Sequence, residues 1–316
     1  MSGKIVVLAL FLVLLLSFAA SAQHPEVILK NEMAEKMADL TLSSGMCLKP
    51  VFSIPEGKMD DMIRMGIVRI DRDGGGRINL YEALIEIEKD PISYLEELRA
   101  RDYNHASMVT ADEGGPIYEF RGHRYTVTIP EYCDLAYETS FNLYNTHLSF
   151  PDGHFIESGV GWIGRAANWP TEGLNLYVYN SYSGEFSFRS ISDSFTPIPD
   201  GYGREITLSV RIDCFTGRGV MYGYDPVSRT HILREDYIYA DRGCVDQCQE
   251  QHSYSFVWTP TGEAYHFNNR LWGEYDDQPI DWICDGVPTD FWPEPPMHLQ
   301  IDEYDGKSAM VTWCEP

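Results

Sequence analysis

The strongest constraint on the fold is a strict alternation of polar and apolar residues over nine positions in the second half of the chain. Residues 205–213 are Glu-Ile-Thr-Leu-Ser-Val-Arg-Ile-Asp. Successive side chains of a β-strand point to opposite faces, so this pattern places all four aliphatic side chains of the run on one face. The run therefore predicts a strand with one side in a hydrophobic core.

Less regular runs of the same kind occur from about residue 117 onward. They lie at residues 124–129, 174–180, 185–191, 219–224, 229–233, 253–258 and 263–267. Turn-forming residues separate them, for example Thr216-Gly217 and Asp225-Pro226. About ten short strands without a helical pattern between them predict an antiparallel β-sandwich over residues 117–294. The pair of strands at 206–224 resembles those of concanavalin-like jelly rolls.

Residues 71–82 carry a different pattern, Asp-Arg-Asp-Gly-Gly-Gly-Arg-Ile-Asn-Leu-Tyr-Glu. This run resembles an EF-hand calcium loop, in which oxygen ligands recur at fixed positions and a glycine stands at the sixth. The resemblance implies that calcium is bound at Asp71, Asp73, Gly75, Arg77, Asn79 and Glu82, with the backbone carbonyl as the ligand at Arg77. Apolar residues at helical spacing on both sides predict an entering helix up to Ile70 and an exiting helix from Leu80.

The predicted fold class is therefore α+β. A helical EF-hand module is expected over residues 23–102, followed by a linker at 103–116 and the antiparallel, jelly-roll-like β-sandwich. Helices are also predicted at 25–41 and 90–101. EF-hands usually work in pairs and only one competent loop is present, so the partner is either a metal-free hand or a second copy of the chain in a homodimer.

Three features of the loop weaken the predicted calcium affinity. Gly75 removes a side-chain oxygen at the fifth position, three consecutive glycines cost entropy on ordering, and Arg72 and Arg77 bring positive charge close to the cation. We expect a dissociation constant of roughly 10⁻⁴–10⁻³ M, the range of extracellular modules.

The first 22 residues have the pattern of a secretory signal peptide, with Lys4, an apolar core and the small residues Ala20-Ser21-Ala22 before the expected cleavage site. No later segment reaches the length of about 20 apolar residues that a membrane span needs. The net charge of −24 disfavours nucleic acid and anionic membranes as partners. A secreted, extracellular protein is predicted, whose partners are calcium and an extracellular protein or glycan.

All seven cysteines follow the signal peptide, and in an oxidising compartment disulfide bonds are expected. Six of them allow fifteen pairings, which the sequence does not distinguish, and Cys314 is the expected unpaired one. Cys244, Cys248 and His252 have a four-residue spacing that would suit zinc on a helix, but a fourth ligand is not apparent.

Residues 295–316 contain two short apolar runs, and the second includes Trp313. They resemble the opening strands of a fibronectin type III domain. Two explanations stay open: the chain is a fragment of a longer protein, or these strands complete the preceding domain.

No catalytic motif is present: the chain has no Gly-x-Ser-x-Gly, no His-Glu-x-x-His and no phosphate-binding glycine loop. Carboxylate pairs for glycoside hydrolysis have candidates in Glu157, Glu185, Asp302 and Glu303. Candidates for stacking on sugar rings are the tryptophans Trp162, Trp169, Trp258, Trp272, Trp282 and Trp292. The sequence favours a secreted calcium-binding protein with a matrix or adhesion role. The alternative is a carbohydrate-directed jelly-roll protein, a lectin or glycoside hydrolase, with an accessory EF-hand.

Overall fold

The computed structural model describes residues 58–88, 102–112, 115–129, 140–163, 173–192, 203–253, 262–273, 277–278, 283–284, 298–304 and 308–314. The predicted signal peptide and the helices predicted at 25–41 and 90–101 lie outside these residues. Within the described part of the chain, neither helix has the length and apolar character needed to cross a membrane.

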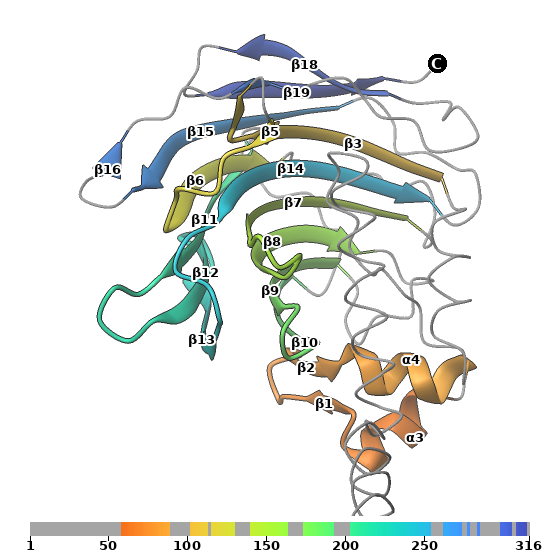
Figure 1. The fold of residues 1–316 in the computed structure, drawn as a ribbon. Coiled ribbons are helices and arrows are strands. Elements are labelled where there is room, and N and C mark those ends of the chain that lie inside the picture. The colour runs from red at the N-terminus through yellow and green to blue at the C-terminus, as the bar shows by residue number, and fades with distance from the viewer. Residues whose placement is uncertain are drawn as a thin grey trace, which may run out of the picture.

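The fold is a sandwich of two antiparallel sheets (Figure 1). The first has nine strands, in the order β1 (Val68–Ile70), β2 (Gly76–Asn79), β10 (Glu185–Ser192), β9 (Gly173–Asn180), β8 (Phe155–Ile163), β7 (Ser140–Ser149), β14 (Cys244–Ser253), β3 (Asp102–Val109) and β17 (Ile283–Cys284). The second has eight: β13 (Thr230–Tyr237), β12 (Arg218–Asp225), β11 (Arg204–Ile212), β6 (Gly122–Ile129), β15 (Gly262–Trp272), β19 (Ala309–Cys314) and β18 (His298–Tyr304), with β16 (Asp277–Gln278) paired to β15. β4 (Ala111–Asp112) and β5 (Gly115–Pro116) form a separate pair.

The hydrophobic core lies between the two sheets. The alternation in 205–213 is confirmed, because Ile206, Leu208 and Val210 are fully buried in this core while the neighbouring Glu205 and Arg211 are exposed. From the other sheet, Trp162 of β8 and Tyr144 of β7 contribute buried rings.

The prediction of an α+β fold with a helical EF-hand module is wrong. Only two short helices, α3 (Lys58–Met65) and α4 (Leu80–Glu88), occur among the described residues, and the rest of their regular structure is β. The entering helix ends five residues earlier than predicted because Gly66, at φ 76°, closes it. The N–H groups of Gly66 and Ile67 donate to the carbonyls of Ile63 and Met62, the Schellman pattern that glycine stabilises.

A β-hairpin lies between α3 and α4, where a calcium loop joining two longer helices was expected. β1 pairs with β2, and β2 in turn pairs with β10, so the hairpin extends the nine-stranded sheet at its edge. The stretch expected as a linker, residues 103–116, includes β3, which pairs along β14 over eight residue pairs. In the tail, β18 and β19 form a hairpin that joins the eight-stranded sheet through β15.

Candidate active site on the outer face of the nine-stranded sheet

Three neighbouring strands carry a row of ionisable side chains on the face of the sheet that points away from the core. Tyr144 and Leu148 of β7 belong to the core, so the alternation of the strand turns His147 to the opposite face. In the strand register, His147 stands directly opposite Glu157 of β8 on one side and Asp246 of β14 on the other. The register alone therefore brings Glu157, His147 and Asp246 into one line across β8, β7 and β14.

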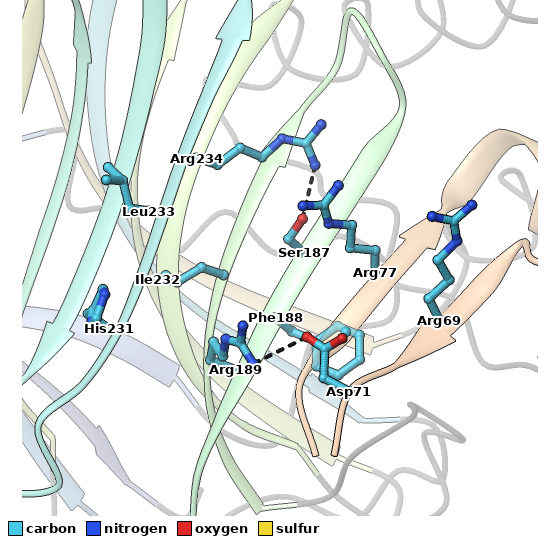
Figure 2. A pocket seen from close by; sticks show the side chains of 11 residues that line it. Arg69, Asp71, Arg77, Ser187, Phe188, Arg189, His231, Ile232, Leu233 and Arg234 are labelled. Atoms are coloured by element: carbon cyan, nitrogen blue, oxygen red, sulfur yellow. Dashed lines mark hydrogen bonds and ion pairs between the residues drawn. The ribbon is translucent and has the colours of Figure 1, made fainter. Parts of the chain in front are cut away.

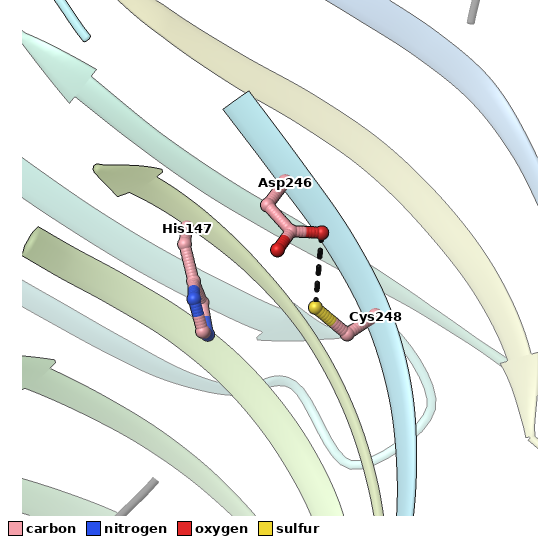
Figure 3. A group of neighbouring side chains, drawn as sticks. All are labelled: His147, Asp246 and Cys248. Carbon is pink, nitrogen blue, oxygen red and sulfur yellow. Dashed lines mark hydrogen bonds between the residues drawn. The ribbon is translucent and has the colours of Figure 1, made fainter. Parts of the chain in front are cut away.

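The side chains of this row are buried, and Figure 3 shows His147 and Asp246 of the row together with Cys248. His147 Nε2 lies 3.4 Å from Glu157 Oε2. The thiol of Cys248, one pleat along β14, donates to Asp246 Oδ1 at 3.1 Å. Glu157 and His147 are each 1% exposed and Asp246 is 6% exposed. We call these four residues the acid–imidazole row.

Tyr177 of β9 covers one end of the row. Its partner across the strands is Gly159 of β8, and a Cβ at Gly159 would overlap the Tyr177 ring. The missing side chain lets the ring lie across β8 and hydrogen bond with Glu157. Burial raises the pKa of Tyr177 well above its ordinary value, and the charges of Glu157 and Glu250 raise it further, so the phenol keeps its proton and donates.

A second buried pair lies next to the row. Asn145 of β7 stands opposite Cys248, and its side-chain amide donates to Glu250 Oε1 of β14 at 3.2 Å. Both residues are completely buried. The same face of β14 thus presents Asp246, Cys248 and Glu250 in sequence, each contacting a polar partner.

Burying so many ionisable groups destabilises a fold, since each carboxylate or imidazole loses hydration that hydrogen bonds restore only in part. Aliphatic side chains would fill the same positions at lower cost in folding free energy. Clusters of this kind concentrate at functional sites, where a proton or a metal ion is handled. This cost marks the acid–imidazole row as the candidate site.

The row also contains a set of metal-ligating atoms. Within the described part of the chain, one trio of His, Cys, Asp or Glu side chains places its ligand atoms within 4.8 Å of one another, and it is His147, Asp246 and Cys248. Imidazole nitrogen, thiolate sulfur and carboxylate oxygen are the donors that zinc takes, and three protein ligands with an open fourth position are typical of catalytic zinc. The trio suits zinc better than calcium, which takes six to eight oxygens.

A separate polar layer lies between the two sheets. His266 of β15 accepts a hydrogen bond from Gln247 Nε2 at 2.9 Å and donates to Gln249 Oε1 at 3.3 Å. His123 of β6 lies 2.7 Å from Thr146 Oγ1 and 3.1 Å from Asn269 Oδ1. Burial lowers the pKa of each histidine to about 3. Both are neutral at ordinary pH and hold the sheets together.

The predicted calcium ligands are only partly brought together. Arg189 of β10 inserts its guanidinium between the first two of them, with Nη1 3.2 Å from Asp71 Oδ2 and 2.7 Å from Asp73 Oδ1. The Asp71 N–H donates to the carbonyl of Gly75 at 2.5 Å, closing the hairpin loop. A positive charge therefore stands where the two carboxylates converge.

The remaining predicted ligands have other partners or positions. Asn79 Oδ1 accepts the N–H of Glu82 at 3.2 Å, which makes Asn79 the N-cap of α4. In the β1–β2 ladder, the N–H of Asp71 donates to the Gly75 carbonyl and the N–H of Asn79 donates to the Ile67 carbonyl. Every second residue pair of an antiparallel ladder is hydrogen-bonded, so the pair Arg69 and Arg77 between these two is hydrogen-bonded as well. The Arg77 carbonyl therefore accepts a hydrogen bond from Arg69. Glu82 is exposed on α4.

The carboxylate and tryptophan candidates for a carbohydrate site lie in different parts of the structure. Glu157 belongs to the row, whereas Glu185 lies on β10 and pairs with Arg234 and Arg77. The side chains of Asp302 and Glu303 lie outside the described part of the structure. Trp162 is completely buried in the core and offers no surface to a sugar.

The cysteines of β14 do not form a helical zinc site, because residues 244–253 are a strand. Cys214, Cys244 and Cys248 carry thiols that are not joined in disulfides. Burial raises the pKa of Cys244 to about 11, so this thiol is unreactive. The other four cysteine side chains lie outside the described residues.

Three members of the row, His147, Asp246 and Cys248, were not recognised together from the sequence. They belong to segments that lack regular alternation, Asn-Leu-Tyr-Asn-Thr-His and Cys-Val-Asp-Gln-Cys-Gln-Glu. The sequence signal for these residues is a high density of polar residues between predicted strands. A surface loop has the same composition, so this signal does not identify a site.

Comparisons with known proteins reach no family. No family model matches the chain, and no curated protein matches it. Among solved structures, 39 chains match in shape. Scytalido-glutamic peptidase with a peptide-based transition-state analogue has a TM-score of 0.44 and 9% identity, covering 68% of this chain and 98% of that one. SCP-B, a member of the eqolisin family of peptidases, has a TM-score of 0.40 and 9% identity over the same shares.

Proposed function

We propose that this chain is a hydrolase whose general acid and general base are Glu157 and Asp246. The observation that carries the proposal is the register of the acid–imidazole row: two carboxyl groups stand on either side of one imidazole, on three adjacent strands, in a buried site. Residues with these properties transfer protons in enzymes.

The spacing suits two carboxyl groups with different roles. Glu157 and Asp246 are separated by the single strand β7, which sets their Cα atoms roughly 10 Å apart, two strand spacings. Side chains that lean toward His147 bring the carboxyl groups into the range in which one group protonates a leaving group and the other activates water. Paired carboxyl groups cleave both glycosidic and peptide bonds in this way.

The environments of the two carboxyl groups differ. Glu157 accepts a hydrogen bond from the Tyr177 phenol and faces His147, whereas Asp246 accepts a hydrogen bond from the Cys248 thiol. In acid–base enzymes, the general acid and the general base have different hydrogen-bond partners of this kind. His147, between them, passes a proton from one to the other or holds them in position.

The test is an activity screen of the full chain against polysaccharides and denatured proteins over pH 3–8, with the variants Glu157→Gln and Asp246→Asn. We expect each variant to lose activity by about 10²–10⁴-fold while keeping its fold by circular dichroism. Glu250→Gln, on the same face of β14, is the matched control and should retain most of the activity. Full activity in both row variants would refute the assignment.

A second candidate rests on the trio His147, Asp246 and Cys248, which fits a zinc ion. Here the metal would be held by these three side chains, and Glu157 would orient the imidazole of His147 from its other side. Metal analysis of the purified chain separates the two: stoichiometric zinc that is lost in Cys248→Ala supports the metal centre. A metal-free chain that is active supports the carboxyl pair.

Calcium binding, secretion and a matrix or adhesion role stay predictions from the sequence. They are compatible with a hydrolase, because the loop at 71–82 and the acid–imidazole row lie on different parts of the nine-stranded sheet. The hydrolase proposal favours the catalytic form of the carbohydrate-directed alternative over the adhesive role.

A further inference from the structure

A pocket lined by arginines opens where the two sheets diverge at one edge of the sandwich (Figure 2). It has a volume of about 470 Å³ and lies between the hairpin strands β1 and β2, their neighbour β10, and the edge strand β13 of the other sheet. Its lining includes four arginines, one histidine and one aspartate, and the adjoining Asp73, Glu185 and Asp236 pair with three of the arginines. On a chain with a net charge of −24, such a concentration of positive charge is unexpected.

The sheet register produces this arrangement. Arg69 of β1 stands directly opposite Arg77 of β2, and Arg77 stands opposite Ser187 of β10. In the next strand the same row continues with Val178, which is buried in the core. The apolar inner face of the sheet thus turns cationic at the point where the second sheet ends.

Two of the arginines have strong partners within the protein. Arg234 of β13 pairs with Glu185 and Asp236 and donates to Ser187 Oγ at 2.9 Å. Arg189 pairs with Asp71 and Asp73. These two guanidinium groups form a fixed wall of the pocket, held in place by carboxylates.

The other two arginines are much less satisfied. Arg77 is 64% exposed and reaches Glu185 only at 3.4 Å, and no ion pair of Arg69 occurs among the residues that the structure describes. Like charges directly opposite each other on neighbouring strands are destabilising. An anion bound between Arg69 and Arg77 would attract both guanidinium groups and so offset their mutual repulsion.

We propose that this pocket binds a ligand that carries two or more sulfate or phosphate groups and is about the size of a disaccharide. Guanidinium groups bind tetrahedral oxyanions through paired N–H donors, and Arg69 and Arg77 stand opposite each other on β1 and β2 and both line the pocket. The volume of about 470 Å³ lies in the range of sites for small ligands. The site is separate from the acid–imidazole row, which lies on the opposite face of the same sheet.

The experiment measures binding to the full chain by calorimetry at pH 7 with three probes: sucrose octasulfate, inorganic pyrophosphate and unmodified sucrose. We expect the charged probes to bind, more weakly as salt is added, and sucrose not to bind. The double variant Arg69→Gln/Arg77→Gln should weaken binding by tenfold or more, since each lost charge-assisted contact reduces affinity on the order of tenfold. Tighter binding of the sulfated disaccharide assigns a sulfated glycan, and tighter binding of pyrophosphate assigns a phosphate ligand.

The matched control is Arg124→Gln/Arg211→Gln, which removes two exposed arginines from neighbouring strands of the eight-stranded sheet. It should leave affinity within twofold. The pocket variant removes the repulsion between Arg69 and Arg77, so its melting temperature should be no lower than that of the wild type. The single variant Arg69→Gln should have an intermediate affinity for the charged probes. Equal losses in the two double variants, or unchanged affinity in the pocket variant, would overturn the proposal.

Discussion

At the scale of single residues, the candidate site depends on a side chain that is absent. Gly159 faces Tyr177 across β8 and β9, and the tyrosine ring occupies the space that a Cβ would need. This close approach lets the phenol reach Glu157. Gly161, two residues along the same face, has a comparable relation to Leu143, whose side chain occupies its missing Cβ position.

The two glycines give a matched pair of substitutions. Gly159→Ala should displace Tyr177, cost about 1–3 kcal/mol of folding free energy through overpacking and lower the proposed hydrolytic activity. Gly161→Ala should cost stability too, but less, because a leucine end is more easily moved, and it should spare activity. Thermal melting and activity measured together test this, and an equal effect of both substitutions on activity would contradict it.

At the scale of elements, the β1–β2 hairpin shows how a metal-loop pattern can fold in another way. Gly66 ends α3, β1 begins two residues later, and β2 finds a partner in β10. Arg189 then places its guanidinium between Asp71 and Asp73. Both carboxylates are more than half exposed, so these ion pairs contribute little to stability.

Arg189 should therefore compete with calcium for the loop. If the loop binds calcium with a dissociation constant of roughly 10⁻³ M, then 10 mM calcium stabilises the chain by about 1.4 kcal/mol. Arg189→Gln should strengthen binding by about tenfold, since one positive charge no longer has to be displaced. Calorimetry measures this, with Asp73→Asn as the variant that should abolish binding. Identical affinities for wild type and Arg189→Gln would show that Arg189 does not occupy the calcium position.

At the scale of the whole molecule, the sequence predicts best those strands that have one face in the core and the other exposed to solvent. Strands β6, β11 and β12 alternate and were found. Strands β7 and β8 are buried on both faces, and their polar and apolar residues do not alternate, so the sequence pattern does not predict them. β9 is buried along its whole length as well, yet its residues 174–180 alternate enough to predict a strand. The candidate site lies on β7, β8 and β14, and its members are polar residues in segments without a periodic pattern.

The two sheets are joined by polar contacts as well as by the core, and these contacts make the sandwich sensitive to acid. His123 on β6 bonds to Thr146 on β7, and His266 on β15 bonds to Gln247 and Gln249 on β14. The Tyr125 ring stacks between the two imidazoles, with ring centroids 5.5 and 5.6 Å away. A proton on either histidine would put a charge into this layer.

This layer predicts a loss of stability on acidification. Burial lowers the folded-state pKa of both histidines from 6.5 to about 3, so the unfolded chain takes up protons below pH 6.5 that the folded chain excludes. Stability is therefore fully present above pH 6.5 and falls toward pH 3, by about 1.4 kcal/mol per pH unit for each histidine. Calorimetric melting between pH 7 and 4.5 measures the slope. His266→Gln should fold less stably at pH 7 but lose stability on acidification by about 1.4 kcal/mol per pH unit less than the wild type. If its slope equals that of the wild type, His266 accepts its proton in the folded state, and the neutral imidazole layer is not what holds the sheets together.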